Sequence, residues 1–224
     1  MRDSLLTVAV AVGLAMLSLS AAHAQGARGA QGAQGYVGGG LGRGYINVDC
    51  NDLASCDKSN TGGKVYGGYR SASQWALEAV YFDFGKVKAQ STESVPVPAS
   101  GSAVPLESTS IMVTVDGELK ANGLGVGAAY LMPFSDDWNA VARLGVMRTD
   151  GKITGRGSAE GVTYSESASK TSTQAYFGFG LGYNLSPNLA LTAEADFSRV
   201  KYGLEGEYET DSVRLISIGL RYSF

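Results

Sequence analysis

The chain has 224 residues, of which 31 are glycine and 17% are charged, and its formal net charge is −3. Glycine is thus about twice as frequent as its average of roughly 7%, and charged residues fall below the usual quarter. The acidic balance gives no electrostatic case for nucleic-acid binding, and a hydrophobic content of 44% argues against a disordered chain.

The N-terminal residues 1–24 have the pattern of a secretory signal peptide. Arg2 supplies a positive end, residues 5–19 are largely apolar, and Ala22 and Ala24 are the small residues that signal peptidase requires. An uncleaved membrane anchor is the alternative, but the apolar run is short for one. We expect cleavage after residue 24, then a flexible, low-complexity leader over residues 25–35 and a barrel domain over residues 36–224.

Beyond residue 35 the sequence alternates with a period of two, which is typical of strands with two different faces. In residues 171–185 one face is apolar and aromatic, and the other is small and polar. Similar alternation gives eight predicted strands in all: residues 36–48, 64–70, 75–81, 119–132, 140–146, 171–185, 189–198 and 216–224.

The predicted connections alternate between short and long. Short turns are expected at residues 71–74, 133–137 and 186–188, and long loops at residues 49–62, 87–109, 149–170 and 201–211. This alternation around an even number of strands is typical of outer-membrane barrels. We therefore predict an all-β fold, an eight-stranded antiparallel transmembrane β-barrel with an up-and-down meander. A soluble barrel or sandwich is the alternative, but its exposed apolar stripes would aggregate in water.

Eight strands leave an interior only wide enough for side chains, so we expect the glycine-rich, charged face to point inward and the aromatic face to meet lipid. Successive residues of a strand point to opposite faces, and we call the face that a residue shares with every second neighbour its parity. Parity then places five charged side chains inside the lumen: Glu78, Arg143, Glu194, Asp196 and Arg221. Because a charge in a low-dielectric interior needs a partner, we interpret them as lumen ion pairs that plug the barrel. A narrow, non-specific pore for small solutes stays open as the alternative, since the inward row of Gly178, Gly180 and Gly182 reduces the bulk inside.

Cys50 and Cys56 lie in the first long loop of an exported chain, where disulfides persist. We expect them to form a disulfide, with two free thiols as the alternative. The Pro- and Ser-rich loop at residues 95–105 is expected to be exposed and available to an extracellular ligand. The exported part contains no histidine to act as a general base, so we expect no enzyme, and no spacing of ligands predicts a metal or a cofactor.

Several segments resemble OmpA-like outer-membrane β-barrel domains. The resemblance lies in residues 55–59 (SCDKS), 65–70 (VYGGYR), 75–86 (WALEAVYFDFGK), 142–145 (ARLG) and 215–224 (LISIGLRYSF). Phe224, with Tyr222 two positions earlier, is similar to the C-terminal signal that the barrel-assembly machinery reads. The likeness covers the barrel only, without the peptidoglycan-binding domain of the family's two-domain members.

The resemblance implies insertion into a Gram-negative outer membrane by that machinery, contact with lipid and lipopolysaccharide, and a monomer. It implies a structural and surface-interaction role, with loops for adhesion or recognition. It also covers part of a lumen ion-pair network. Glu78, Arg143 and Glu194 occupy matching positions, whereas charged partners of the best-known member are replaced here by Ala129, Gly182 and Thr192.

Overall fold

In the computed structural model, residues 33–50, 54–96, 110–159, 162–204 and 207–224 are described. The predicted signal peptide, the leader up to residue 32 and most of the loop at residues 95–105 lie outside these ranges. No helix among the described residues is long and apolar enough to cross a membrane.

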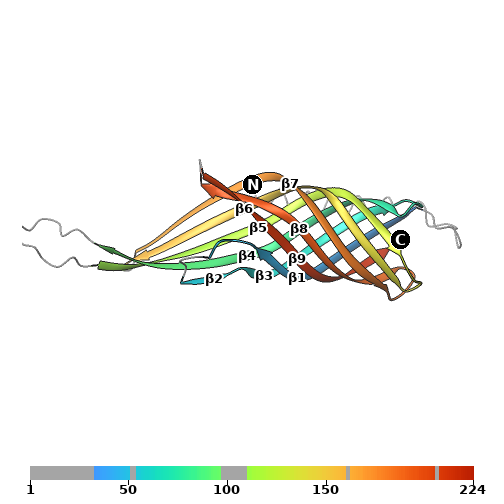
Figure 1. Cartoon of the computed structure of the whole chain (residues 1–224), viewed down its shortest axis with the longest axis horizontal. Helices are drawn as coiled ribbons and strands as arrows, with labels where there is room; N and C mark the ends of the chain where they lie inside the picture. The colour runs from blue at the N-terminus through green and yellow to red at the C-terminus, as the bar shows by residue number, and fades with distance from the viewer. Residues whose placement is uncertain (1–32, 51–53, 97–109, 160–161, 205–206) are drawn as a thin grey trace, which may run out of the picture.

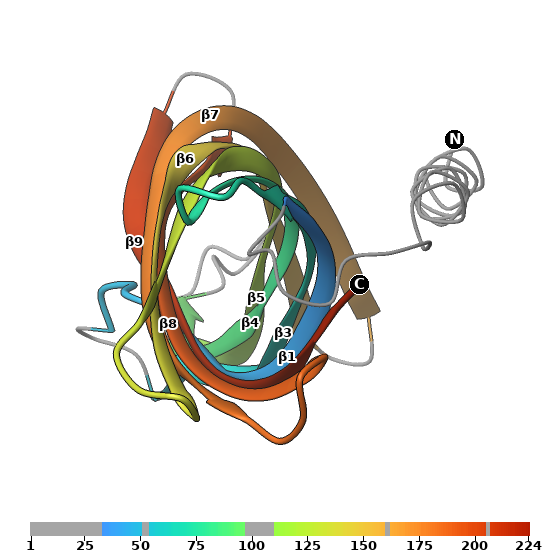
Figure 2. The ribbon, with the colours of Figure 1, turned by 90° about the vertical axis from the view of Figure 1, so that its right-hand side faces the viewer.

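Eight long strands and one short strand make up the barrel (Figure 1). The long strands are β1 (Gln34–Ile46), β3 (Ser59–Arg70), β4 (Trp75–Pro96), β5 (Ser110–Pro133), β6 (Trp138–Ala159), β7 (Val162–Asn184), β8 (Leu189–Leu204) and β9 (Glu207–Ser223). The short β2 (Ser55–Asp57) pairs with the far part of β4. All neighbours are antiparallel, and β1 pairs with β9 to close the ring, which is seen end-on in Figure 2. The predicted meander is confirmed.

The predicted boundaries of the long loops are wrong, because many of their residues belong to strands. β4 and β5 stay paired out to Pro96 and Ser110, and β6 and β7 out to Ala159 and Val162. These four strands have 22 to 24 residues each, whereas a tilted strand needs only ~9–11 residues to span a bilayer. In the extended parts water meets both faces, so the apolar alternation disappears although the pairing continues. At the other end, β1 begins at Gln34, within the segment expected to be the leader.

Outward apolar side chains form a band around the end of the barrel that carries the short turns. On β7 it comprises Phe177, Phe179, Leu181 and Tyr183, which are 38–56% exposed. Further along the neighbouring strands, the outward positions become polar at Asp83 on β4, Asn122 on β5 and Arg148 on β6. At the turn end, the ring of Trp75 lies 5.0 Å from that of Tyr130, and Trp138 lies 5.1 Å from Tyr183. An apolar band with an aromatic border suits a lipid bilayer.

The interior also holds large aromatic side chains, contrary to the expectation that they would all face lipid. Five of them are buried inside the barrel, each at most 5% exposed: Tyr36, Tyr66, Phe82, Phe84 and Tyr176. Inward glycines provide the space. A Cβ atom on Gly125 would lie 3.0 Å from the Tyr176 ring, and one on Gly127 would lie 2.7 Å from its hydroxyl. Rings packed against glycine backbone therefore fit within eight strands.

A β-bulge on β4 separates the barrel from its extension. The register with β5 shifts between Asp83 and Lys86, and Gly85 has a φ of +79°, a conformation that favours glycine. The Gly85 N–H donates to Asp83 Oδ1 at 2.9 Å. Past this point β2 replaces β3 as the neighbour of β4, so the bulge marks where the closed ring gives way to the projecting sheet.

The β8–β9 hairpin turns inward above the apolar band. β7 pairs with β8 only between Phe177 and Asn184, although β8 and β9 stay paired to Leu204 and Glu207. A Cβ atom on Gly151, at an inward position of β6, would lie 2.7 Å from the carbonyl oxygen of Lys201. The upper part of β8 therefore packs on the inner face of β6 and covers the lumen from that side.

Candidate functional site

Six charged side chains are buried among the described residues, and parity places all of them inside the barrel. None is more than 6% exposed. The set comprises three cations and three carboxylates, whose formal charges cancel: Lys64, Arg143, Arg221, Glu78, Glu194 and Asp196. A balanced set is what a low-dielectric interior tolerates.

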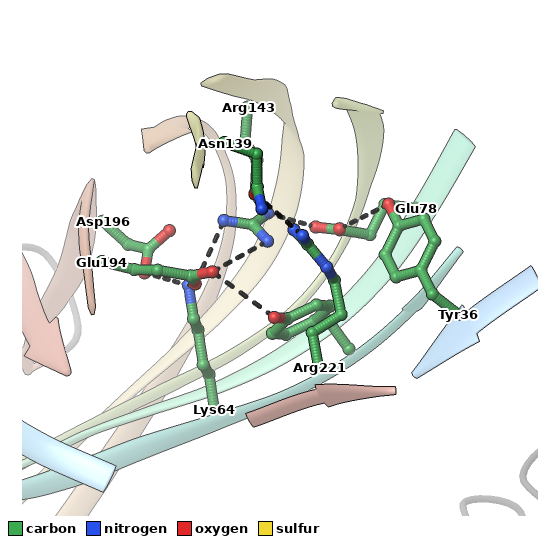
Figure 3. Close-up of polar contacts among 9 residues, drawn as sticks. Tyr36, Lys64, Glu78, Asn139, Arg143, Glu194, Asp196 and Arg221 are labelled. Atoms are coloured by element: carbon green, nitrogen blue, oxygen red, sulfur yellow. Dashed lines mark hydrogen bonds and ion pairs between the residues drawn. The ribbon is translucent and has the colours of Figure 1, made fainter. Parts of the chain in front are cut away.

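Arg143, on β6, is the centre of this cluster (Figure 3). Its Nε atom donates to Glu78 Oε1 at 2.7 Å, and its Nη1 atom lies 3.1 Å from Glu194 Oε2. Glu78 is on β4 and Glu194 on β8, which lie on opposite walls of the eight-stranded ring. Because a guanidinium presents five donors in a fixed fork, one arginine bridges the lumen from wall to wall.

Lys64, on β3, is the second paired cation, and the sequence analysis missed it. Its Nζ atom forms ion pairs with Glu194 and, at 2.5 Å, with Asp196 Oδ2. The signal was present, because Lys64 shares the parity of the inward Tyr66 and alternates with the outward Val65. Lys64 thus brings β3 into the network of buried charges.

Two tyrosine hydroxyls, also missed from the sequence, contact the carboxylates of Glu78 and Glu194. Tyr36 Oη donates to Glu78 Oε2 at 2.8 Å, and Tyr66 Oη donates to Glu194 Oε1 at 3.4 Å. The guanidinium carbon of Arg143 lies 4.7 Å from the centroid of the Tyr66 ring, within the range of a cation–π contact. These donors stabilise the ionised carboxylates, which would otherwise be costly to bury.

Arg221 does not join the ion pairs, contrary to the prediction. Its Nη2 atom donates to Asn139 Oδ1 at 2.8 Å, and no carboxylate of a described residue lies within ion-pair distance of it. The reason is register: the residue of β9 that lies opposite Glu194 is Ser217, which puts Arg221 nearer to the turns. The structure therefore brings together four of the five predicted residues: Glu78, Arg143, Glu194 and Asp196.

The remaining predicted residues lie outside the lumen. The structure joins Cys50 and Cys56 in a disulfide with a Cα–Cα distance of 5.9 Å, as predicted. Tyr222 and Phe224 are half-exposed on the outer face, and their rings stack at 6.4 Å. The N–H and C=O groups of Phe224 both bond to Gly35 of β1. In the described part of the chain, no group of three His, Cys, Asp or Glu side chains could hold a metal ion.

Two hollows lie at opposite ends of the molecule, and neither is lined by the ion-paired residues Lys64, Glu78, Arg143, Glu194 and Asp196. The hollow at the turn end has a volume of about 430 Å³, and its wall includes Arg70, Asn139 and Arg221. The hollow beside the extended hairpins has a volume of about 760 Å³, and its wall includes Lys152 and Arg156. The arrangement therefore offers a cross-linked charge layer inside the barrel and open polar sites at its ends.

A family model for the outer membrane protein β-barrel domain matches residues 10–224. Among solved structures, the chain is similar to Neisserial surface protein A, with 14% identity, a TM-score of 0.52 and coverage of 86% of this chain and 99% of that one. It is similar to Ail, the attachment invasion locus protein of Yersinia pestis, with 19% identity, a TM-score of 0.50 and the same coverages. The N-terminal barrel of Pseudomonas aeruginosa OprF gives 14% identity and a TM-score of 0.46, over 85% of this chain and 97% of that one. At these identities the likeness shows the fold alone. No curated protein matches the chain.

Proposed function

The chain belongs to the outer membrane protein β-barrel domain family, and from this premise we propose that it is a closed barrel with a structural and surface-interaction role. Its lumen is plugged by ion pairs, and its extended hairpins are available for adhesion or recognition outside the cell. The observation that carries the proposal is the bridge that Arg143 makes between Glu78 and Glu194 on opposite walls.

The plug rests on both charge and volume. A solute that crosses this layer must part Arg143 from a carboxylate that is almost fully buried, and breaking a buried pair typically costs ~3–5 kcal/mol. The stacked rings of Phe82 and Phe84, with centroids 5.3 Å apart, and the ring of Tyr176 fill the space beside the charges. These buried side chains occupy the lumen at the level of the charges.

The extended hairpins supply the surface for interactions. Cross-strand ion pairs run along the β4–β5 extension, with Lys86 Nζ 3.1 Å from Glu118 and Lys120 Nζ 3.7 Å from Asp83. Each exposed pair contributes little stability, but together they keep a long paired hairpin compatible with water. The neighbouring hollow suits a polar ligand, because its wall carries both signs of charge: Lys88, Lys152, Arg156, Asp57, Asp116, Glu118 and Glu166.

We propose no catalytic role for this surface. The only histidine of the sequence is His23, within the predicted signal peptide. A serine or carboxylate without a base or partner tuned to the task is a poor catalyst at neutral pH.

Conductance across planar lipid bilayers tests the plug. Purified wild-type protein is expected to give no discrete channels, and Arg143→Ser is expected to open them. Lys86→Ser, which breaks an exposed ion pair, is the matched control and is expected to stay silent. Reproducible channels from the wild type would instead support a narrow pore for small solutes. A silent Arg143→Ser variant that folds normally would show that the ion pairs do not close the lumen.

Adhesion of whole cells tests the surface role. In a trimmed variant, residues 91–115 are replaced by an Asn-Gly turn that joins Gln90 to Asp116, which face each other across the two strands. Cells with the full chain are expected to bind immobilised matrix proteins or glycosaminoglycans better than cells with the trimmed chain. Equal adhesion at equal surface expression would argue against a recognition role for this hairpin.

A further inference from the structure

The hollow at the turn end of the barrel contains two arginines that lack a counter-ion. Its wall includes Arg70, Arg221, Gln34, Asn139 and Asn184. No carboxylate of a described residue, nor the C-terminal carboxylate, lies within 4.0 Å of either guanidinium. Two cations that share one partly enclosed space raise each other's free energy, so an anion placed between them would be favoured.

Arg221 has donors to spare. It is 6% exposed, and its one hydrogen bond to another residue is to Asn139. A guanidinium carries five N–H donors, and none of the nitrogens of Arg221 is both fully enclosed and without a partner. Those that do not contact Asn139 are therefore open to the hollow. Figure 3 shows the Arg221 guanidinium directed toward Asn139.

A relay of amides holds Arg221 in place. Asn139 Nδ2 donates to Asn184 Oδ1 at 3.0 Å, and Asn184 Nδ2 donates to the carbonyl oxygen of Asp136 at 3.1 Å. The relay thus runs from the β5–β6 turn to the guanidinium. On the other wall, Arg70 Nη2 donates to Gln34 Oε1 at 2.5 Å. Side chains that are fixed before binding lose little entropy when a ligand arrives, which is how a binding site differs from an accidental surface charge.

The rim of the hollow limits the charge of its ligand. Asp136 and Asp137 lie on its wall, are exposed and pair with neither arginine. Exposed carboxylates are screened by water and salt, so they do not neutralise the arginines, but they repel an anion of high charge. The combination favours a group with one negative charge, such as a carboxylate or a phosphate diester.

We propose that Arg70 and Arg221 form a binding site for a single carboxylate or phosphate group that enters from the turn end. The proposal rests on the proposed function in one respect: the extended hairpins lie outside the cell, which leaves the turn end on the periplasmic side. The site itself does not depend on whether the lumen conducts. The same chemistry is offered by a soluble anion and by the headgroup of a phospholipid in the adjacent leaflet.

The test uses the barrel in a non-ionic detergent, titrated with acetate or dimethyl phosphate, with the Nε–Hε NMR signals of the arginines as the readout. Saturable shifts are expected for Arg70 and Arg221, and the affinity is expected to fall at least tenfold in Arg70→Gln and in Arg221→Gln. Lys152→Gln, in the other hollow, is the control and is expected to bind like the wild type. Asn184→Ala, which keeps both arginines but breaks the relay, is expected to weaken binding by a smaller factor.

Nanodiscs separate the two sources of the anion. A shift that appears in phosphatidylglycerol or phosphatidylcholine nanodiscs, relative to the barrel in the non-ionic detergent and with no soluble anion added, identifies a lipid headgroup. A shift that requires added acetate or dimethyl phosphate identifies a soluble ligand. The absence of a saturable shift in every medium would overturn the proposal. So would equal affinity in Arg70→Gln, Arg221→Gln and the wild type, with folding of each variant verified by its heat-dependent gel mobility.

Discussion

Replacing Lys64 by methionine would remove one cation from the lumen and keep most of the apolar bulk of the side chain. In the wild type Lys64 pairs with Glu194 and Asp196, and the side chains of all three are 1% exposed. The buried charges are balanced only while Lys64 is present. The variant would leave one negative charge in excess inside a low-dielectric interior. A buried charge that has lost its partner strongly destabilises the folded state.

The expected size of the effect follows from this burial. Removing one partner of a buried pair typically costs ~3–5 kcal/mol. With a urea m-value of about 2 kcal/mol per molar, a loss of ~4 kcal/mol would lower the unfolding midpoint by about 2 M. The matched control is Lys86→Met, because Lys86 and Glu118 form an ion pair whose side chains are 43% and 37% exposed. An exposed pair contributes less than ~1 kcal/mol.

The assay is urea unfolding of the barrel in lipid vesicles, followed by the fluorescence of Trp75 and Trp138 in the aromatic border. The double variant Lys64→Met with Asp196→Leu restores the charge balance and is expected to recover most of the lost stability. If Lys64→Met lowers the free energy of unfolding no more than Lys86→Met does, water reaches Glu194 and Asp196. That result would refute the conclusion that these carboxylates lie in a low-dielectric interior.

Gly85→Ala is expected to cost about 1–3 kcal/mol, because an L-residue is strained at a φ of +79°. Gly155→Ala, with open space around its Cβ position, is expected to cost nothing measurable in the same urea assay. The double change Cys50→Ser and Cys56→Ser is expected to lower the stability by about 2 kcal/mol, since the bridge closes a short loop; an unchanged midpoint on reducing the wild type would contradict this. Phe224→Ala is expected to slow the appearance of heat-modifiable barrel in the outer membrane in a pulse-chase experiment, and wild-type kinetics would argue against its role as an assembly signal.

Period-two alternation predicts this fold well where one face of a strand meets lipid. Residues 171–185 alternate sharply, and β7 has its outward apolar face there. The same strand begins at Val162, but its first residues are solvated on both faces and leave no apolar signal. The length of the extended hairpins could therefore not be predicted from hydrophobicity, because backbone pairing alone maintains it.

Parity predicts which side of a strand a charge occupies, but not its height in the barrel. Glu78, Arg143 and Glu194 meet because the register of the whole ring brings them to one level, and that register is a collective property of all the strand pairs. The same register places Ser217 opposite Glu194 and takes Arg221 out of the cluster. Parity alone could have predicted that Lys64 points into the lumen. The hydrogen bonds of Asn139 could not have been predicted in this way, because they depend on the height of each residue in the barrel.

Because β1 pairs with β9, the barrel closes only in a late step of folding, and it closes cooperatively. Tyr36 lies opposite Ser223, so the ring cannot close before the last strand is available, and contacts this distant in sequence are slow to form. Until then the open edges of β1 and β8 expose backbone N–H and C=O groups. Each such group costs several kcal/mol in hydrocarbon. A chain that lacks β9 would thus be expelled from the bilayer or left at its surface. Closure of the β1–β9 pair therefore restricts stable insertion to chains that contain β9.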